Sequence, residues 1–480
     1  MTAIDRLYLE LSEELARSIR NGVLARGERL PSVRTLAAQR AVSVSTAVQA
    51  YRALEDARLI EARPRSGYYV AARPRALPEP ETTQPPVVSQ PVPASLLAQR
   101  VMQLATDSRY VSFGAACPGP ELFDQDRIRR AVTRSALRHR ALLARYEFGQ
   151  GQEPLRRAIA RHAMALGCQL DPERIIVTNG CRDALTLALR AITQPGDVVA
   201  LESPTYFGLL NILRHLGLRA LEIPTHPRHG LALDALQLAL DTQPVKAVLA
   251  VPTLTNPVGA CMPVAERRRL LRLLEQHDVP LVEDAIYNDL CEQAEYRRAV
   301  KSFDTRGQVL LCGSFSKTVA PGMNLGWVEA GRWFDALSAL KGDTVGSQPA
   351  VVQLALADLL GQPGNESNYR SLRAAFAQRV DEARGLVAQA FPKGTRVTDP
   401  PGGYILWLEL PGAVDGLALF EACLAEHIVI APGCMFSSTD RYDHCIRLGV
   451  AGAWGDAQRR ALRRVGAIAT TMARADRRAA

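Results

Sequence analysis

The stretch that decides the fold lies at residues 308–318 and reads QVLLCGSFSKT. Its first five residues form a short apolar run of strand length, and a small polar turn carrying Lys317 follows. Similar apolar runs precede it at 174–178, 197–201, 245–251 and 280–284, with amphipathic stretches such as 181–192 and 263–278 between them. This alternation predicts an α/β fold with a mainly parallel sheet, which binds its ligands at the carboxyl ends of the strands.

Lys317 is the candidate nucleophile of this sheet. The chain has only five lysines against 53 arginines, and a lysine amine desolvated at a strand end can attack an aldehyde. The segment SFSK also fits the Ser-x-x-Lys pattern of serine acyl enzymes. That chemistry needs a Ser-x-Asn and a Lys-Thr-Gly element downstream, and neither stands where it is expected, so aldehyde chemistry is favoured.

Four other residues favour an aldehyde cofactor with a phosphate and an aromatic ring. Gly180 follows a strand and opens a helix, where free N–H groups and the helix dipole bind phosphate. Asp284 ends a strand, and a buried carboxylate there would keep a pyridine nitrogen protonated. Asn256 can donate a hydrogen bond to a ring oxygen, and Tyr206 can stack on the ring. Each residue alone has an ordinary structural explanation. The order of these residues along the chain is therefore the evidence that favours a cofactor site.

That order, continued by Tyr287, Lys317 and Arg447, resembles the fold-type-I pyridoxal-phosphate-dependent aminotransferases over about residues 105–470. The resemblance implies that Lys317 binds the cofactor covalently and that Asp284 pairs with the pyridine nitrogen. It implies that Asn256 and Tyr287 contact the phenolic oxygen. Around the phosphate it places Gly180, Cys181, Arg182, Ser314 and Ser316.

The same resemblance implies two further roles. Arg447, in the segment CIRLG, matches the arginine that binds the substrate α-carboxylate, a task suited to a planar guanidinium. Tyr146 stands five residues before Gly151 and nine before Leu155, as in the Tyr-x4-Gly-x3-Leu-Arg segment of the family. In that family this tyrosine reaches the active site of the neighbouring subunit.

Two positions depart from the family pattern. Asn324 stands seven residues after Lys317, where these enzymes usually carry a phosphate-binding arginine. Cys181 and Arg182 follow Gly180, where small polar residues or glutamine are common. We hypothesise that the Arg182 side chain partly replaces the missing charge, in which case Arg182→Ala weakens cofactor binding by about tenfold or more.

A second, smaller unit precedes this one. Residues 1–75 hold thirteen arginines, no lysine and eight acidic residues, within a chain of 480 residues and net charge +9, which favours an acidic partner such as nucleic acid. Apolar spacing predicts helices at about 5–21, after Pro31-Ser32, and from about Ser43. Leu59-Ile60 and the run 68–70 predict a β-hairpin with an arginine-bearing tip. Helix, short turn and helix is the frame that inserts its second helix into the DNA major groove.

This N-terminal unit resembles the GntR-type winged helix-turn-helix over residues 4–70, most closely in GERLPSVRTLA at 27–37. The resemblance implies operator binding; a three-helix protein-interaction module is the structural alternative. Ser45, Thr46, Gln49 and Arg52 are expected on the outward face of the second helix of the motif. The candidate DNA contacts are Arg34, Ser43, Ser45, Thr46, Gln49, Arg52, Arg63, Arg65 and Gly67.

The expected domain order is a winged helix-turn-helix over 1–71, a linker over 72–95 with seven prolines, and an aminotransferase-like domain over 96–480 whose small α+β subdomain is mainly 365–480. This combination resembles the MocR family of bacterial regulators. It implies a head-to-tail homodimer that binds operator DNA and senses an amine, an amino acid or pyridoxal phosphate. A working aminotransferase with an accessory DNA-binding unit remains the alternative.

Cysteine spacing and hydropathy restrict the remaining classes of protein to which the chain can belong. The nine cysteines are scattered without a Cys-x-x-Cys pair, which indicates reduced, buried thiols and neither a disulfide framework nor a zinc site. The chain has no apolar run long enough to cross a bilayer and no basic-then-apolar leader, so a cytoplasmic protein is expected.

Overall fold

The computed structural model describes residues 3–20, 24, 28–56, 59–63, 66–70, 77–86, 88–93, 96–344, 346–362, 364–412, 414–439 and 441–479. The chain divides into two compact units, Met1–Ala76 and Leu77–Ala480, which are described separately. The division lies within the segment 72–95 that the sequence predicts as a linker.

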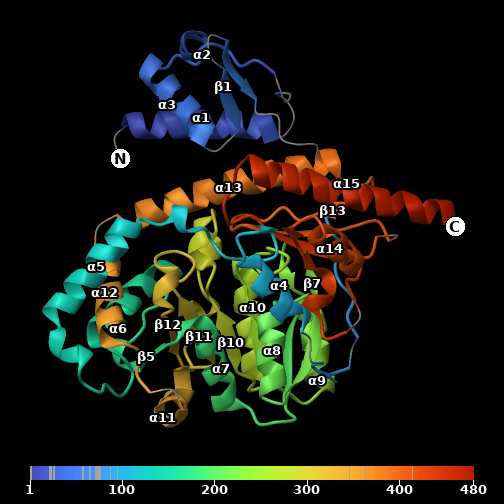
Figure 1. The fold of residues 1–480 in the computed structure, drawn as a ribbon. Coiled ribbons are helices and arrows are strands. Elements are labelled where there is room, and N and C mark those ends of the chain that lie inside the picture. The colour runs from blue at the N-terminus through green and yellow to red at the C-terminus, as the bar shows by residue number, and fades with distance from the viewer. Residues whose placement is uncertain are drawn as a thin grey trace. The chain divides into compact units, whose positions relative to one another are not determined.

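Over its described residues, the N-terminal unit has three helices and a two-stranded hairpin, as predicted (Figure 1). Its elements are α1 (Ala3–Arg20), α2 (Val33–Gln39), α3 (Val44–Asp56), β1 (Ile60–Arg63) and β2 (Gly67–Val70). The strands pair antiparallel from Ile60–Val70 to Arg63–Gly67. Leu36, Ala47, Tyr51 and Leu54 are buried in a shared core, and the Tyr51 hydroxyl donates to the Pro31 carbonyl (2.7 Å). This core holds α2 and α3 in a fixed helix-turn-helix arrangement.

Both helices of the motif begin at a serine cap. The Ser32 hydroxyl accepts the Thr35 N–H (3.2 Å), and the Ser43 hydroxyl accepts the Thr46 N–H (3.1 Å). A serine in this position satisfies an N–H that has no acceptor within the helix. Between the caps, Ala41 has φ of +50°, which makes the tight turn expected at Ala41-Val42.

The large unit is built on a mixed, mainly parallel nine-stranded sheet in the order β3-β7-β6-β9-β10-β11-β12-β5, with β8 paired to β7. Neighbours from β7 to β11 are parallel, whereas β12 is antiparallel to both β11 and β5. The strands are β3 (Gln90–Pro91), β5 (Ile175–Thr178), β6 (Val198–Ser203), β7 (Arg219–His226), β8 (Gly230–Leu231), β9 (Val245–Ala250), β10 (Leu281–Asp284), β11 (Val309–Ser314) and β12 (Gly326–Glu329). The α/β prediction is confirmed, and the predicted strands agree closely with the observed ones.

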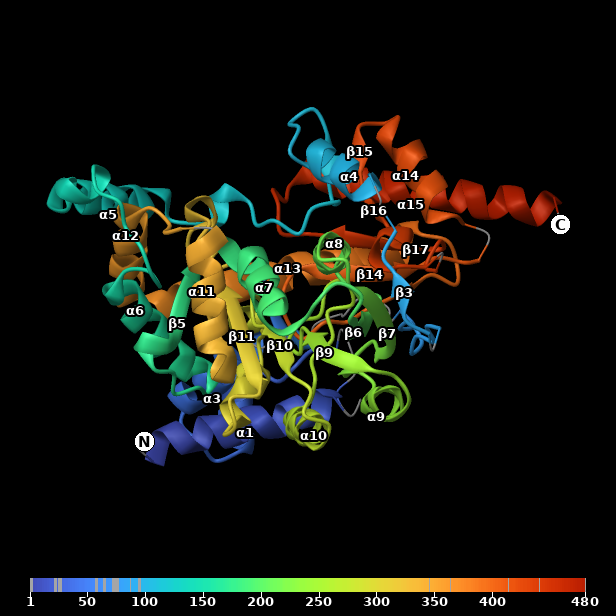
Figure 2. The same ribbon diagram turned by 90° about the horizontal axis from the view of Figure 1, so that it is seen from below.

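Helices cover both faces of this sheet (Figure 2). Alternate residues of β6 belong to different cores: Val199 and Leu201 pack with α7 and α8, whereas Val198 and Ala200 pack with α9 and α10. This alternation follows from the two-residue period of a strand. The helices are α4 (Leu97–Ala105), α5 (Gln125–Arg138), α6 (Glu153–Ala163), α7 (Gly180–Ile192), α8 (Phe207–His215), α9 (Leu233–Thr242), α10 (Val264–Gln276), α11 (Phe334–Thr344) and α12 (Ala350–Gly361).

The C-terminal part of the large unit forms the expected small α+β layer. A four-stranded antiparallel sheet, β13-β14-β17-β16, packs with α13, α14 and α15 (Figure 1). The pair β15 and β4 (Val111–Ser112) joins this layer to the start of the unit. Its elements are α13 (Asn365–Ala390), β13 (Arg396–Val397), β14 (Ile405–Glu409), α14 (Gly416–Leu424), β15 (Ile428–Val429), β16 (Ala431–Pro432), β17 (Cys445–Gly449) and α15 (Asp456–Ala479).

The proline-rich segment packs on the large unit over its described residues. Residues 90–91 form β3 on the edge of the sheet, the Thr83 hydroxyl donates to the Ser203 carbonyl (2.6 Å), and the Val397 N–H donates to the Pro78 carbonyl (2.9 Å). Prolines keep a chain extended and leave its carbonyls free to accept, and an edge strand tolerates them. The segment expected to be a semi-rigid linker over 72–95 therefore packs on the large unit at 77–86 and 88–93. Within the described residues, no helix has the length and apolarity to cross a membrane.

Candidate functional site

The candidate site lies at the carboxyl ends of the parallel strands. Asp284 ends β10, Ser314 ends β11, and Asn256 follows β9. Gly180 opens α7 directly after β5, and Tyr206 stands between β6 and α8. The parallel sheet therefore brings together residues that are more than a hundred positions apart in the sequence.

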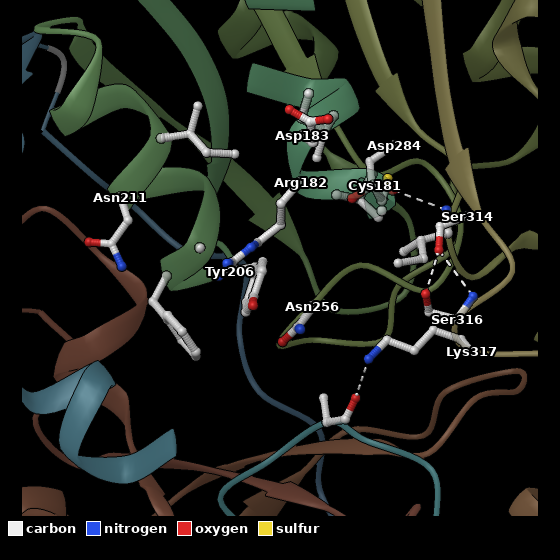
Figure 3. A pocket seen from close by; sticks show the side chains of 18 of the residues that line it. Cys181, Arg182, Asp183, Tyr206, Asn211, Asn256, Asp284, Ser314, Ser316 and Lys317 are labelled. Atoms are coloured by element: carbon white, nitrogen blue, oxygen red, sulfur yellow. Dashed lines mark hydrogen bonds between the residues drawn. The ribbon is translucent and has the colours of Figure 1, made fainter. Parts of the chain in front are cut away.

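These residues line one cavity of about 690 Å³. Figure 3 shows Lys317, Ser314 and Ser316 on one side of it and Arg182, Tyr206 and Asn211 on the other, with Asn256 between them. Every residue predicted for the cofactor site and for the carboxylate lines this cavity: Gly180, Cys181, Arg182, Tyr206, Asn256, Asp284, Tyr287, Ser314, Ser316, Lys317 and Arg447. Its volume suits a cofactor together with a small ligand.

Lys317 lies in the turn after β11, and its amine reaches into the cavity. Nζ donates to the Ala116 carbonyl (2.9 Å), which also accepts from the Tyr404 hydroxyl (3.1 Å). Burial lowers the pKa of the Lys317 amine below its ordinary value of 10.5. A lowered pKa increases the fraction of neutral amine, which is the nucleophilic form.

Asp284 is almost fully buried, and two donors hold its carboxylate. Oδ1 accepts the Ile286 N–H (3.0 Å) and the Cys181 thiol (3.3 Å). Burial raises the pKa of Asp284 to about 6. This carboxylate can therefore pair with a cationic ring nitrogen, which would favour its ionised form.

Asn256 links Tyr287 to Arg447. The Asn256 amide nitrogen lies 3.5 Å from the Tyr287 hydroxyl, and its Oδ1 lies 3.4 Å from Arg447 Nη1. Arg447 is buried, its Nη2 donates to the Gly114 carbonyl, and its guanidinium carbon lies 5.1 Å from the Phe436 ring centre. Arg447 Nε is buried without a partner among the described residues, so a donor remains for a ligand.

The N-terminus of α7 and the turn after β11 form an anion cradle. Gly180 has φ of +75°, and a Cβ there would lie 2.7 Å from Asn324 Oδ1, so glycine is required on both counts. The Ser314 hydroxyl donates to Ser316 Oγ (2.9 Å) and accepts the Ser316 N–H (3.0 Å). First-turn N–H groups of a helix have no intrahelical acceptor and favour an anion.

Arg182 contributes its backbone to this cradle but directs its side chain elsewhere. Its guanidinium points toward Tyr206 and Asn211, away from Ser314 and Ser316 (Figure 3). The Arg182 charge counteracts the rise that burial causes in the pKa of Tyr206. In this conformation the side chain does not take the place of the arginine that Asn324 replaces.

Several cavity residues were not anticipated from the sequence. Cys117 is exposed and lines the cavity, although the cysteines were expected to be buried and were assigned no chemistry. Asn211 and His215 of α8, with Met102 of α4, extend the cavity beyond Tyr206. Their helical spacing indicates only a helix face, because the depth of a cavity depends on how α4 and α8 pack.

Tyr146 lies outside the cavity and is exposed in this single chain. Its side chain is 88% exposed and stacks on Phe148, which is 82% exposed, with ring centres 6.3 Å apart. Leu137 and Leu143 of the same region are also exposed. Aromatic and aliphatic groups gathered in this way are typical of a protein interface.

The N-terminal unit presents most of the predicted DNA contacts at its surface. Arg34 on α2 is exposed, as are Ser45, Gln49 and Arg52 on α3. Thr46 was expected on this face but is buried (3% exposed), because its hydroxyl hydrogen-bonds the Ser43 cap (2.8 Å). That prediction is corrected.

The wing carries Arg63 and Gly67 at the ends of its strands. Arg63 pairs with Glu61 (2.6 Å) and lies over the Tyr69 ring (4.3 Å to its centre), and Gly67 has φ of +104°. The left-handed conformation explains a glycine at the start of β2. Arg65 lies outside the described residues.

Comparisons with known proteins agree with the resemblances noted for the large unit and for the N-terminal unit. The family "Aminotransferase class I and II" matches residues 122–465, and "Bacterial regulatory proteins, gntR family" matches residues 7–70. The HTH-type transcriptional regulator YjiR of Escherichia coli is 35% identical over 461 residues, covering 96% of this chain and 98% of that protein. The probable rhizopine catabolism regulatory protein MocR of Rhizobium meliloti is 26% identical over 446 residues, covering 90% and 88%.

A solved structure shares the large unit. LysN, an α-aminoadipate aminotransferase from Thermus thermophilus complexed with N-(5'-phosphopyridoxyl)-L-leucine, matches with a TM-score of 0.70 and 26% identity, covering 78% of this chain and 98% of that one.

Pyridoxal 5'-phosphate is the cofactor of this aminotransferase fold, and the residues present fit it. The cavity combines a lysine amine of lowered pKa, a buried carboxylate at a strand end, a helix N-terminus and an unpartnered Arg447 Nε. The chain belongs to the aminotransferase class I and II family and, through its GntR-type N-terminal unit, to the MocR family of transcriptional regulators.

Proposed function

We propose that this regulator binds operator DNA with its N-terminal unit and senses an amine or amino acid in the pyridoxal-phosphate pocket of its large unit. The observation that carries the proposal is that Lys317, Asp284, Asn256 and Arg447 line one cavity in a chain that also has a helix-turn-helix unit. A cofactor site in the same chain as a DNA-reading module suits a sensor better than a catabolic enzyme.

The cofactor-binding residues have distinct tasks in this proposal. When bound, pyridoxal phosphate supplies an aldehyde that exchanges between the protein's lysine and a ligand amine. Lys317 provides the protein amine. Asp284 pairs with the ring nitrogen, and Asn256 and Tyr287 hydrogen-bond the phenolic oxygen. The Asn256–Tyr287 contact (3.5 Å) would keep both groups oriented toward that oxygen.

The phosphate end is held mainly by backbone and hydroxyl groups. Gly180, Cys181 and Arg182 offer the N–H groups of the first turn of α7, and Ser314 and Ser316 offer hydroxyls. Tyr206 stacks on the ring. With Asn324 in place of an arginine, this end has fewer positive charges than is usual in the family.

Arg447 binds the carboxylate of the ligand in this scheme. Burial lowers the pKa of its guanidinium, yet an arginine stays protonated at neutral pH because its ordinary pKa is so high. The Asn256 and Gly114 contacts fix the plane of the guanidinium and leave Nε for the incoming carboxylate. An amino acid whose amine replaced the Lys317 amine on the aldehyde would release that lysine and would be held by the ion pair between its carboxylate and Arg447.

In this proposal, the exposed face of α3 contacts the DNA. Ser45, Gln49 and Arg52 would meet base edges and phosphates, and Arg34, Ser43, Arg63, Arg65 and Gly67 would contact the backbone. The Ser43 hydroxyl caps α3. Ser43 would therefore aid DNA binding by holding in place the helix N-terminus that faces a DNA phosphate. Thr46 supports that cap from the buried side.

Coupling between the two functions would pass through a head-to-tail homodimer in the cytoplasm. Tyr146 and its exposed aromatic neighbour would reach the partner's cofactor site. Closure of the C-terminal layer around a ligand would change the dimer shape and so the spacing of the two DNA-binding units. A ligand shifts this equilibrium only by its differential affinity for the two states.

The test is the visible absorbance of the purified full-length protein, wild type against Lys317→Ala, titrated with amines and amino acids. Lys246→Ala, at an exposed lysine, is the matched control. A yellow band that only Lys317→Ala loses, and that one class of ligand shifts, supports the sensor. Sustained keto-acid production from an amino-acid and keto-acid pair would favour the alternative, a working aminotransferase.

A further inference from the structure

A second cavity of about 550 Å³ adjoins the cofactor cavity and extends it away from Lys317. It lies between α4 and α8, and five residues line both cavities: Met102, Arg182, Phe207, Asn211 and His215. We call this second cavity the annex. A ligand bound between Lys317 and Arg447 can therefore extend past Tyr206 into the annex.

The annex is rich in hydrogen-bond donors and cationic groups. Arg182, Arg214 and His215 line it together with the amides of Gln99 and Asn211. No aspartate or glutamate lines it among the described residues. The surroundings therefore favour an anionic group and would penalise a second cation.

The two arginines of the annex differ from Arg100 and Arg447, which have a carboxylate and a carbonyl partner. On α4 itself, Arg100 forms a two-point pair with Glu421. No carboxylate lines the annex beside Arg182 and Arg214 among the described residues. Arg214 Nε is buried without a hydrogen-bond partner, and Arg214 Nη2 lies 3.1 Å from His215 Nε2.

The orientation of Arg182 agrees with this assignment. Its guanidinium points toward Asn211 and Tyr206 (Figure 3), so it lies on the annex side of the cofactor cavity. A buried donor without an acceptor costs free energy, and an anion that reaches the annex would recover it. Met102 and Phe207, which line both cavities, offer apolar contact to a methylene spacer.

We propose that the effector of this regulator carries a second acidic group, a carboxylate or a phosphonate-like oxyanion, and that Arg182 and Arg214 bind this distal group in the annex. The inference rests on the proposed function, since it assumes that the amine and the first carboxylate are bound at Lys317 and Arg447. It narrows the ligand class from amino acids in general to amino acids with an acidic side chain.

The test compares ligand pairs of equal chain length on full-length protein loaded with cofactor. The pairs are glutamate and norvaline, 2-aminoadipate and norleucine, and 2-aminopimelate and 2-aminoheptanoate, with 2-amino-5-phosphonopentanoate as the oxyanion arm. Dissociation constants come from the shift in cofactor absorbance and, independently, from calorimetry. For at least one pair the acidic member should bind about tenfold tighter, the size expected for a charge-assisted contact.

Arg182→Gln and Arg214→Gln should each remove most of this preference. For Arg214→Gln, which lies outside the cofactor cavity, the affinity for the apolar member should change less than about threefold. Arg190→Gln is the matched control, because Arg190 is an exposed arginine at the other end of α7. Equal affinities within every pair, or a preference that survives both variants, overturn the inference even when ligands shift the absorbance. If cofactor is bound but its absorbance responds to no ligand, the proposed function fails, and calorimetry still decides whether the annex binds the acidic member.

Discussion

The Cys181 thiol donates a hydrogen bond to the Asp284 carboxylate, with 3.3 Å between Sγ and Oδ1. Cys181 belongs to the first turn of α7, which forms the anion cradle, whereas Asp284 ends β10. The contact therefore fixes the phosphate end of the pocket relative to the group that would meet the ring nitrogen. Burial raises the pKa of this thiol well above its ordinary value, so the proton needed for donation is retained at neutral pH.

Asp284→Asn should raise the folding stability of the cofactor-free protein and weaken its binding of the cofactor. Burial raises the pKa of Asp284 from 3.8 to about 6, so ionisation destabilises the cofactor-free fold as the pH rises through this range. The penalty is absent below pH 3.8 and fully present above pH 6. We expect cofactor-free Asp284→Asn to be more stable than wild type by about 1–3 kcal/mol at pH 7, with no such advantage at pH 4.

The measurement is urea unfolding of both cofactor-free proteins at the two pH values. Cofactor titration of the same variant should show a dissociation constant raised about 10- to 100-fold, because a charged hydrogen bond is lost. A variant of unchanged stability at pH 7 would contradict the burial argument, and unchanged cofactor affinity would contradict the pairing with the ring nitrogen.

Arg182→Ala tests the hypothesis drawn from the sequence, in which this side chain compensates for Asn324. Because the guanidinium points away from Ser314 and Ser316 and the backbone N–H survives the substitution, we expect the cofactor dissociation constant to change less than about threefold. Fluorescence titration of cofactor-free protein measures it. A loss of tenfold or more would restore the compensation hypothesis.

Asn324→Arg tests whether the absence of an arginine at this position weakens binding of the cofactor phosphate. An arginine at this position should lower the cofactor dissociation constant about tenfold through a charge-assisted contact. It should also cost about 1 kcal/mol of folding stability, because Asn324 has φ of +46° and asparagine tolerates this conformation better than most residues. Asn324→Gln, uncharged but of the same backbone preference as arginine, should show the stability cost without the gain in affinity.

The DNA face can be tested within α3. Gln49→Ala should weaken operator binding by about 1–3 kcal/mol and relax base preference, as expected for a side chain at a base edge. Arg52→Ala should weaken binding uniformly and lower the salt dependence by about one unit of log-log slope. Arg17→Ala, at an exposed position of α1, is the control. Fluorescence anisotropy with salt titration measures all three, and equal effects of Arg17→Ala and Arg52→Ala would argue against α3 as the reading helix.

The strand ends and their polar residues could be predicted because the signals are local. Lys317, Asp284 and Gly180 each follow a short apolar run, and the topology of parallel strands then brings them to one edge. Thr46 was predicted on the wrong face of its helix, because apolar spacing does not reveal the hydrogen bond with the Ser43 cap. The docking of residues 77–86 and 88–93 also escaped prediction, since it depends on acceptors and donors such as Ser203 and Thr225 that are remote in sequence.

In the proposed function, ligand exchange at Lys317 controls DNA binding. The most direct measurement is operator affinity of cofactor-loaded wild type, Lys317→Ala and Lys246→Ala, on the DNA that wild type selects from a random pool, with and without 2-aminoadipate and the other amino acids tested above. We predict that one of these ligands changes the operator affinity of wild type and Lys246→Ala by at least about fivefold, the lower range of allosteric coupling, and leaves Lys317→Ala unchanged. An equal ligand response in Lys317→Ala, or no response in wild type to any of them, would contradict the account.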